Sequence, residues 1–99
     1  MRLSPHQREA IRSVTAEVAG PDARVLLFGS RTRPEARGGD IDLLVELDRV
    51  VADRVALACR IGTRIEMLLG EQKVDILLAD PATPPSPVLD AARRDGIPL

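Results

Sequence analysis

The amino-acid sequence predicts an α/β (α+β) fold in which a small mixed β-sheet is flanked by helices. Three observations lead to this prediction. Segments with the helical spacing of apolar residues alternate with short apolar runs of strand length. Glycine or proline stands at most of the boundaries, and 99 residues, of which 44% are hydrophobic, can bury one modest core. We therefore expect a single domain over residues 1–99, with its core at about 5–80.

Three segments carry the signals of helices. Ser4 and Gln7 can form a capping box at the start of the first, and Gly20 follows its end. Ser86 is a potential N-cap for the last, which follows a proline-rich, extended connector over 80–87. The expected helices span about 5–19, 50–69 and 87–95.

The expected helix at 50–69 has an apolar stripe that should face the core. A single cysteine, Cys59, excludes an intramolecular disulfide, and its apolar neighbours favour a small core residue over a reactive thiol. The stripe consists of Val51, Val55, Ala58, Ile61, Ile65 and Leu68.

Three short apolar runs are predicted strands. The second of them does not alternate between apolar and polar residues, which is typical of a strand covered on both faces. Between the first two runs, residues 29–39 are rich in glycine and arginine and predict a loop, with one helical turn after Ser30. The expected strands span 24–28, 41–47 and 73–79.

Composition limits the function classes. The net charge of −1 leaves no broad basic surface, and Phe28 is the only Phe, Tyr or Trp ring, so general nucleic-acid binding is not expected. There is no apolar signal region at the N-terminus and no apolar run long enough to span a membrane, so we expect a cytoplasmic protein with no membrane contact. Three further ionisable residues are expected at the surface: His6, Glu46 and Glu71.

Three aspartates are the candidate metal ligands. Asp40 and Asp42 are two residues apart at the start of a strand, so both carboxylates point to one side. On its own, such a pair more often caps a turn and faces solvent. Asp75 lies in an otherwise apolar strand, where a carboxylate is costly unless it is paired or bound to metal. Its alternative is a salt bridge with Lys73 or an arginine. If the two strands are neighbours, the three carboxylates can bind Mg²⁺.

A glycine and a serine follow the first predicted strand. Gly29 allows close approach of the backbone to a ligand, and Ser30 adds a hydroxyl to an anion-binding turn. The spacing fits neither a Walker A loop nor an EF-hand. Three arginines in this loop either contact a triphosphate or an acidic partner, or form a solvated loop with Glu35: Arg31, Arg33 and Arg37.

Taken together, strand–Gly-Ser–loop–Asp-x-Asp–strand, helix and strand–Asp form a specific pattern. It resembles the nucleotidyltransferase superfamily of the DNA polymerase β type, and more closely its minimal bacterial members. The matching residues are 27–31, 39–46 and 74–76. The loop over 31–39 is one residue shorter than in most family members, and Gly39 stands where serine is common. We expect the glycines at 38 and 39 to absorb this deletion through their wide backbone angles.

The resemblance implies roles for the candidate residues. Gly29 and Ser30, together with Arg31, would bind the phosphates of a nucleoside triphosphate. Asp40 and Asp42 would bind two divalent ions, most simply Mg²⁺. Asp75 would complete one metal site and help to deprotonate the acceptor.

The resemblance also implies the reaction and the partner. A small domain of this kind transfers a nucleotide, most simply AMP from ATP, and relies on a partner or a second copy to complete its site. Minimal members pair with an all-helical HEPN protein, and in toxin–antitoxin pairs they silence this ribonuclease toxin by adding AMP to a tyrosine hydroxyl. Two alternatives stay open. One is an antitoxin that acts by contact alone, and the other is transfer to a small molecule, such as an aminoglycoside, held by a separate chain.

Overall fold

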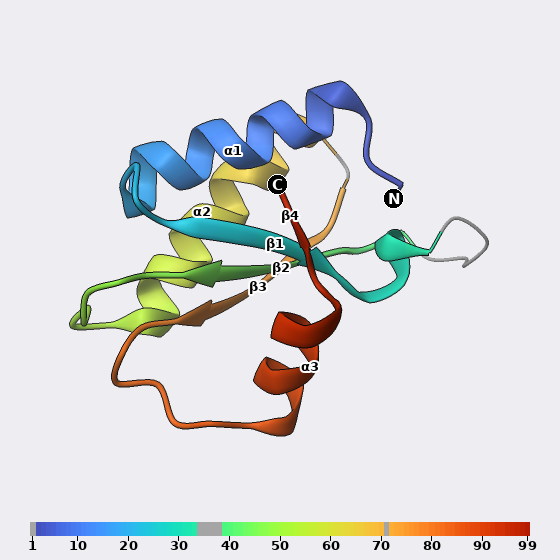
Figure 1. Ribbon diagram of the computed structural model, residues 1–99. Helices are drawn as coiled ribbons and strands as arrows, with labels where there is room; N and C mark the ends of the chain where they lie inside the picture. The colour runs from blue at the N-terminus through green and yellow to red at the C-terminus, as the bar shows by residue number, and fades with distance from the viewer. Residues whose placement is uncertain (1, 34–38, 71) are drawn as a thin grey trace.

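The computed structural model describes residues 2–33, 39–70 and 72–99. Within these ranges, the three predicted helices and three predicted strands follow one another in the predicted order, and one further short strand follows the last helix (Figure 1). The elements are α1 (Pro5–Ala19), β1 (Arg24–Phe28), the 3₁₀ turn η1 (Gly29–Thr32), β2 (Ile41–Glu46), α2 (Arg54–Leu69), β3 (Val74–Ala79), α3 (Pro87–Asp95) and β4 (Ile97–Pro98).

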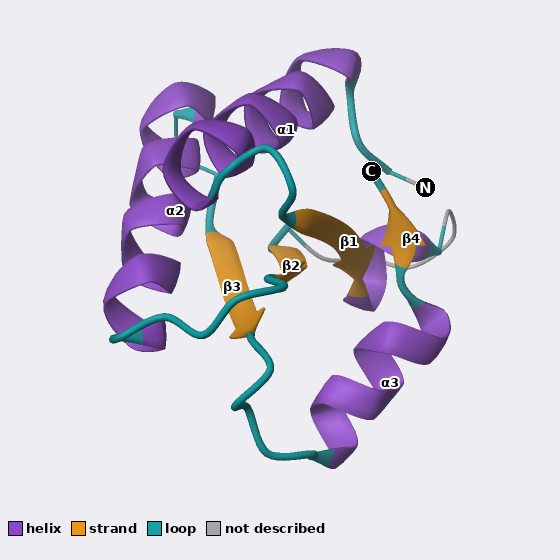
Figure 2. Ribbon diagram, turned by 60° about the vertical axis from the view of Figure 1, so that its left-hand side comes forward, coloured by secondary structure: helices purple, strands orange, loops and turns teal. Residues whose placement is uncertain are grey.

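The four strands form one sheet in the order β3-β2-β1-β4. β1 is antiparallel to both β2 and β4, whereas β2 and β3 are parallel, so the sheet is mixed as predicted. Helices α1 and α2 cover one face and α3 covers the other (Figure 2). The sequence did not predict β4, because two residues are too few to show a period.

Strand alternation divides the core between the two faces. Leu43 and Val45 of β2 point into the larger cluster beneath α1 and α2, whereas Leu44 points toward α3. Both faces of β2 are therefore covered, which confirms the interpretation of its non-alternating sequence. The same alternation places Asp42 on the α3 face. The buried members of the α3 cluster are Leu44, Ala79, Leu89 and Ala92.

The helix boundaries follow from their caps. At α1, Ser4 Oγ accepts from Gln7 N at 3.1 Å and Gln7 Oε1 accepts from Ser4 N at 2.9 Å, so the predicted capping box is present. Ser86 caps α3, as predicted. The predicted start of α2 at residue 50 was wrong, because Asp53 accepts from Ala56 N and begins the helix at Arg54.

The packed face of α2 differs from the predicted stripe. Ile61 and Ile65 are fully buried, but Val55 and Leu68 are 74% and 54% exposed. Cys59 is exposed, so its prediction as a core residue was wrong. The sequence misled because Gly62, which was left out of the stripe, is buried and brings the helix close to β3. No helix in the described ranges is both long and apolar enough to cross a membrane.

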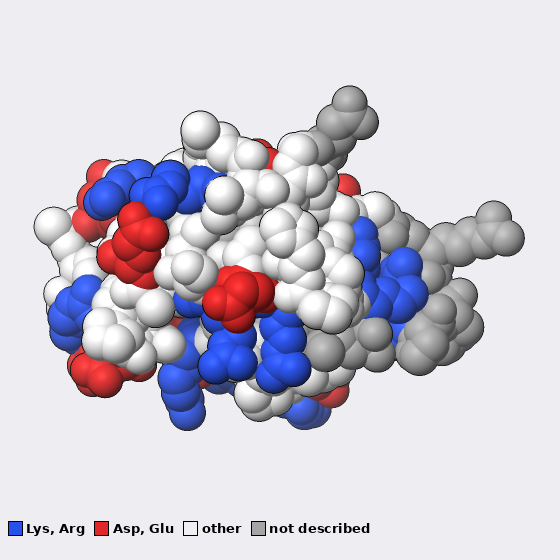
Figure 3. Space-filling view, turned by 90° about the horizontal axis from the view of Figure 1, so that it is seen from above, with Lys and Arg blue, Asp and Glu red and all other residues white. Residues whose placement is uncertain are grey.

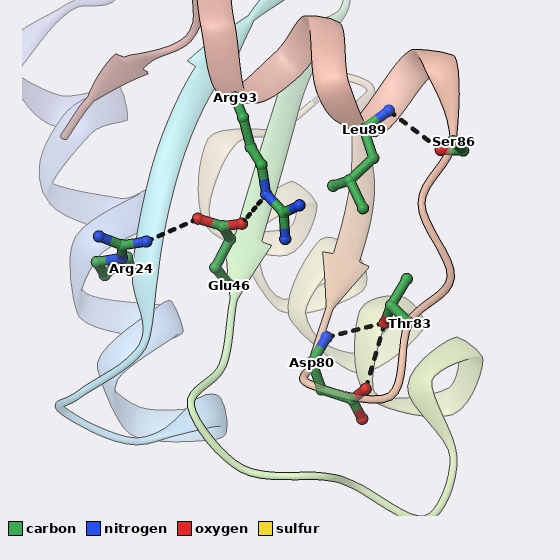
Figure 4. Close-up of polar contacts among 7 residues, drawn as sticks. All are labelled: Arg24, Glu46, Asp80, Thr83, Ser86, Leu89 and Arg93. Carbon is green, nitrogen blue, oxygen red and sulfur yellow. Dashed lines mark hydrogen bonds and ion pairs between the residues drawn. The ribbon is translucent and has the colours of Figure 1, made fainter.

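Two acidic side chains at the C-terminal ends of β2 and β3 are held by hydrogen bonds (Figure 4). Glu46 was predicted at the surface, but its side chain is only 12% exposed and forms ion pairs with Arg24 and Arg93. Three distant parts of the chain meet at this carboxylate, which no local pattern could predict. His6 is exposed, as predicted, and Glu71 lies outside the described residues.

Asp80 closes the turn after β3 and has a fully buried side chain. Its Oδ2 accepts from Val51 N at 2.9 Å, and its Oδ1 accepts from Ala82 N at 2.9 Å. Thr83 Oγ1 and Arg54 Nη1 also donate to this carboxylate. The Val51 hydrogen bond, followed by those of Ala82 and Thr83 and the charge of Arg54, lowers the pKa of Asp80 against the opposing effect of burial.

Replacing Asp80 by asparagine should lower the melting temperature by roughly 10 °C, because both carboxylate oxygens accept backbone N–H groups and an amide NH₂ cannot. Its pKa is lower in the folded protein than the ordinary 3.8, so its stabilising effect is complete above that value and is lost as the pH falls through the folded-state pKa. Thermal melts from pH 7 to pH 3 measure both effects. Asp22→Asn, on an exposed turn, is the matched control, and equal melting of the two variants would contradict the prediction.

Candidate active site

Two of the predicted carboxylates lie side by side on the sheet. Asp42 of β2 and Asp75 of β3 are partners in the parallel ladder, where neighbouring strands are about 4.8 Å apart. Phe28, the last residue of β1, is the partner of Asp42 on its other side. Asp40 precedes Asp42 by two residues, directly before β2 begins. The tertiary structure therefore brings together the aspartates that the sequence singled out.

Within residues 2–33, 39–70 and 72–99, no ion pair neutralises the negative charge of this cluster. Asp42 is half-buried, while Asp40 and Asp75 are exposed. Burial, then the charge of Asp75, then that of Asp40 raise the pKa of Asp42, and only Lys73 acts in the opposite direction. No salt bridge joins Asp75 to Lys73 or to an arginine of the described residues. The alternative role of Asp75 as an ion-pair partner is therefore not what the structure shows.

The chemistry of these side chains fits a hard divalent cation. Carboxylate oxygens with unbalanced negative charge suit Mg²⁺, which keeps several waters and takes further ligands from substrate phosphates. Among the residues described, no three His, Cys, Asp or Glu side chains are already arranged as a complete metal site. The three aspartates as metal ligands thus stay a prediction, in which the nucleotide supplies the remaining oxygens.

Gly29 lies against the Asp42 side chain. Its φ of +76° is in the left-handed region, which disfavours residues with a Cβ. A Cβ at this position would also stand 2.5 Å from Asp42 Oδ2, well inside contact distance. The predicted approach of this backbone to a ligand stays a prediction, and the group that Gly29 approaches in the structure is the carboxylate of Asp42.

The segment after Gly29 turns sharply before the loop. Gly29–Thr32 form the 3₁₀ turn η1, which confirms the helical turn predicted after Ser30. Thr32 Oγ1 donates to Gly29 O at 2.7 Å, and Arg33 N donates to Ser30 O at 3.1 Å. Gly29 and Ser30 are therefore held in one tight turn beside Asp42.

The Arg31 guanidinium forms hydrogen bonds with three other segments next to the candidate site. Its Nη1 donates to Arg2 O at 2.8 Å, and its Nη2 donates to Gly39 O and to Gln72 Oε1, both at 2.9 Å. We predicted that this guanidinium contacts phosphate, but here it holds the backbone next to Asp40. Arg33 is exposed, and Arg37 lies outside the described residues.

Gln72 is a positioning residue that the sequence analysis missed, because nothing distinguishes a polar residue just before a strand. Its Oε1 accepts from Arg31, and its Nε2 donates to Gly39 O and, at 3.1 Å, to Lys73 O. Gly39 directly precedes Asp40, so these bonds tie the start of β2 to the start of β3. We expect the spacing of the carboxylates to depend on these hydrogen bonds.

If the expected nucleotide transfer takes place, Gln72→Ala should lower its kcat by about tenfold, because small displacements of catalytic groups have large effects on rate. KM for the nucleotide and the melting temperature should change little, since Gln72 is only partly buried. Gln72→Glu, which keeps the acceptor for Arg31 but loses the donor to Gly39, should fall between alanine and wild type. An unchanged kcat for Gln72→Ala would refute the positioning role.

The structure also bears on the shortened loop. Gly39 is not among the described glycines with positive φ, and a Cβ there would meet nothing within 4 Å. The expectation that Gly39 absorbs the deletion through unusual angles was therefore wrong. The other glycine in that expectation, at 38, lies outside the described residues.

On the face formed by α1, basic and acidic side chains are interspersed, and no continuous basic surface is present (Figure 3).

Comparison with protein families finds a match to a model described as Nucleotidyltransferase domain, over residues 8–89. The chain belongs to the nucleotidyltransferase domain family. The match begins in α1 and ends in α3, so it contains the Gly-Ser turn and all three aspartates of this nucleotidyltransferase. No curated protein matches the chain significantly.

Family and fold agree on the general activity. A mixed sheet with three helices is the expected nucleotidyltransferase core of the DNA polymerase β-like superfamily, and the domain supports nucleotidyl transfer. Domains of this family typically use a nucleoside triphosphate and a divalent metal.

Proposed function

We propose that this nucleotidyltransferase transfers AMP from ATP to a hydroxyl group of a partner protein in a Mg²⁺-dependent reaction. The observation that supports it best is the pairing of Asp42 with Asp75 on adjacent strands, with Asp40 nearby. No ion pair with another described residue balances their negative charge, and Asp42 lies beside the tight turn at Gly29. A metal–nucleotide complex would supply both the missing positive charge and a group for the turn to bind.

Each candidate residue has one role in this proposal. Asp40, Asp42 and Asp75 would hold Mg²⁺, which supplies electrostatic stabilisation of the phosphates and of the leaving pyrophosphate. Gly29 and Ser30 would bind the outer phosphates through backbone N–H groups and the serine hydroxyl. Positioning and charge neutralisation account for most of the catalysis in reactions of this kind.

The proposed reaction is a single displacement at the α-phosphate. The acceptor hydroxyl oxygen forms a bond to the α-phosphorus, and the bond from that phosphorus to the oxygen bridging it to the β-phosphate breaks. Pyrophosphate leaves with the electron pair of that bond. The hydroxyl proton passes to Asp75, an exposed carboxylate on the open part of the α3 face.

The open face also supports a protein acceptor. Helix α3 packs on the sheet around Leu44, so the part that carries Asp42 and Asp75 stays accessible. We propose that the acceptor is a tyrosine hydroxyl of an all-helical HEPN-type partner, which the protein inactivates as the antitoxin of a cytoplasmic toxin–antitoxin pair. This finer proposal rests on the resemblance to minimal family members.

The test is a labelling experiment with the product of the neighbouring gene as acceptor. The two purified proteins are incubated with Mg²⁺ and each of the four α-³²P-labelled nucleoside triphosphates. We expect label from ATP on the neighbour, and none with the Asp40→Ala/Asp42→Ala variant. A matched Asp22→Ala/Asp48→Ala variant changes two exposed aspartates outside the site and should keep full activity.

Each other outcome selects an alternative. A stable complex that inhibits the neighbour without label, and with the Asp40→Ala/Asp42→Ala variant as effective as wild type, would establish action by contact alone. Label on an added aminoglycoside but not on the protein would establish small-molecule transfer.

A further inference from the structure

A cavity lies toward the end of the sheet that is opposite to the aspartates. It has a volume of about 780 Å³, within the range of small-molecule sites. It follows the outer edge of β1, between α1 and the end of α3. The cavity exists because β4 is short and pairs with only Leu26 and Leu27, which leaves the first part of β1 beside open space.

Thr15 of α1 lines this cavity, and its unpartnered hydroxyl is buried just beneath the cavity wall. The residue is 2% exposed, and its Oγ1 has no hydrogen-bond partner among the described residues. A buried hydroxyl without a partner destabilises a protein, and a helical threonine usually avoids this by bonding to a carbonyl one turn earlier. The Thr15 hydroxyl can therefore gain a partner if its side chain rotates about χ1 toward a ligand in the cavity.

The charges around the cavity favour an anion. Three arginines line it against one glutamate, and that glutamate is already engaged, since Glu46 is paired with Arg24 and Arg93. Arg12, an exposed residue of α1, forms no ion pair within the part of the chain that the structure describes. The remaining lining is mostly apolar, so a ligand with a charged group and an apolar body would match it. This apolar lining includes Ala16, Val25, Leu26 and Pro98.

The hydrogen bonds of the strand edge argue against a peptide as the occupant. A peptide added to the sheet would need the free backbone groups of β1. Leu99 N already donates to Val25 O at 3.0 Å, and β4 pairs with the next two residues. Too little of this edge is free for a further strand, so a small molecule fits the site better.

We propose that this cavity binds a small organic anion, a carboxylate or phosphate ester with an apolar body, through the Arg12 guanidinium and the Thr15 hydroxyl. The site is separate from the proposed active site. Arg24 is opposite Glu46 and Phe28 is opposite Asp42, so four steps along the strand, or about 13 Å, separate the two ends. Binding here requires neither nucleotide nor metal, so this inference can fail or succeed independently of the proposed transferase activity.

The test uses three probes of similar size on the ¹⁵N-labelled protein without metal or nucleotide. Benzoate and phenyl phosphate are the carboxylate and the phosphate ester, and benzamide is the neutral control. We expect both anions to shift the NMR amide signals of Thr15, Ala16 and Val25, with dissociation constants in about the millimolar range for ligands so small. Tighter binding of one anion identifies the chemical class. Equal shifts with benzamide, or shifts confined to the aspartate end, would overturn the proposal.

Two variants assign the contacts. Arg12→Gln should weaken binding of either anion by about threefold to tenfold, whereas the matched Arg60→Gln, on the exposed side of α2, should not. Thr15→Val should weaken binding by about fivefold and yet raise the melting temperature of the free protein by about 3 °C, because it removes a buried hydroxyl without a partner. Unchanged affinity in both Arg12→Gln and Thr15→Val would show that the cavity is not the binding site.

Discussion

Replacing Asp42 by asparagine is expected to lower nucleotide transfer by at least about a thousandfold while making the metal-free protein slightly more stable. The loss of activity follows from the place of Asp42 at the centre of the cluster, between Asp75 and Gly29. An amide keeps the size of the side chain but removes the charge that would bind the metal. The measurement is initial-rate labelling at saturating ATP.

The gain in stability has an electrostatic cause. Like charges at neighbouring positions of a strand pair cost a few tenths to about 1 kcal/mol, and asparagine removes this repulsion. Because the pKa of Asp42 is raised above 3.8 in the folded protein, the folded form binds this proton more tightly than the unfolded chain. The destabilisation is therefore complete at neutral pH and disappears as the pH falls through the folded-state pKa toward 3.8.

Bound Mg²⁺ should make wild type more stable than Asp42→Asn, which reverses their order in the metal-free state. A ligand that binds only the folded form stabilises it in proportion to its occupancy, so saturating Mg²⁺ with a non-hydrolysable ATP analogue should raise the melting temperature of wild type but not of Asp42→Asn. Asp48→Asn, an exposed aspartate just beyond β2, is the control with the same chemical change. A metal-free Asp42→Asn protein less stable than wild type would contradict the electrostatic argument.

The second large effect is expected for Gly29→Ala. At a φ of +76° a Cβ is strained, which costs about 1–2 kcal/mol. The new methyl group would also meet Asp42 Oδ2 at 2.5 Å, so the carboxylate must move. We expect a loss of about 1–3 kcal/mol in the free energy of unfolding, and a fall in kcat of roughly a hundredfold because Asp42 is displaced. Urea unfolding and labelling kinetics measure the two effects.

Substitutions at two other glycines distinguish the effect of backbone strain from the effect of the contact with Asp42. Gly70 has nearly the same φ, +79°, but a Cβ there would meet nothing within 4 Å, and neither would one at Gly39, whose φ is not positive. Gly70→Ala should therefore lose stability without losing activity, and Gly39→Ala should lose little of either. If Gly29→Ala were as active as Gly70→Ala, the contact with Asp42 would have no catalytic importance.

Most secondary structure in this protein could be predicted because its signals are local. The capping box of Ser4 and Gln7 and the N-cap at Ser86 each involve residues three apart, so the ends of α1 and α3 follow from short stretches of sequence. The cap at Asp53 is as local, but the apolar residues before it hid the true start of α2. The face of α2 was harder to predict, since the exposure of Cys59 depends on which side of the helix meets β3.

The sequence by itself determined the order of the three helices and the first three strands, the Gly-Ser turn and the presence of three candidate carboxylates. Only the tertiary structure decided that Asp42 and Asp75 share a register position, that Gly29 leaves no room for a side chain beside Asp42, and that Asp80 is a buried structural carboxylate. The physical reason is the distance along the chain between the residues that interact. Caps and turns are set by bonds within a few residues, whereas the spacing and charge of a site depend on strands that are distant in the chain and meet only when the sheet forms.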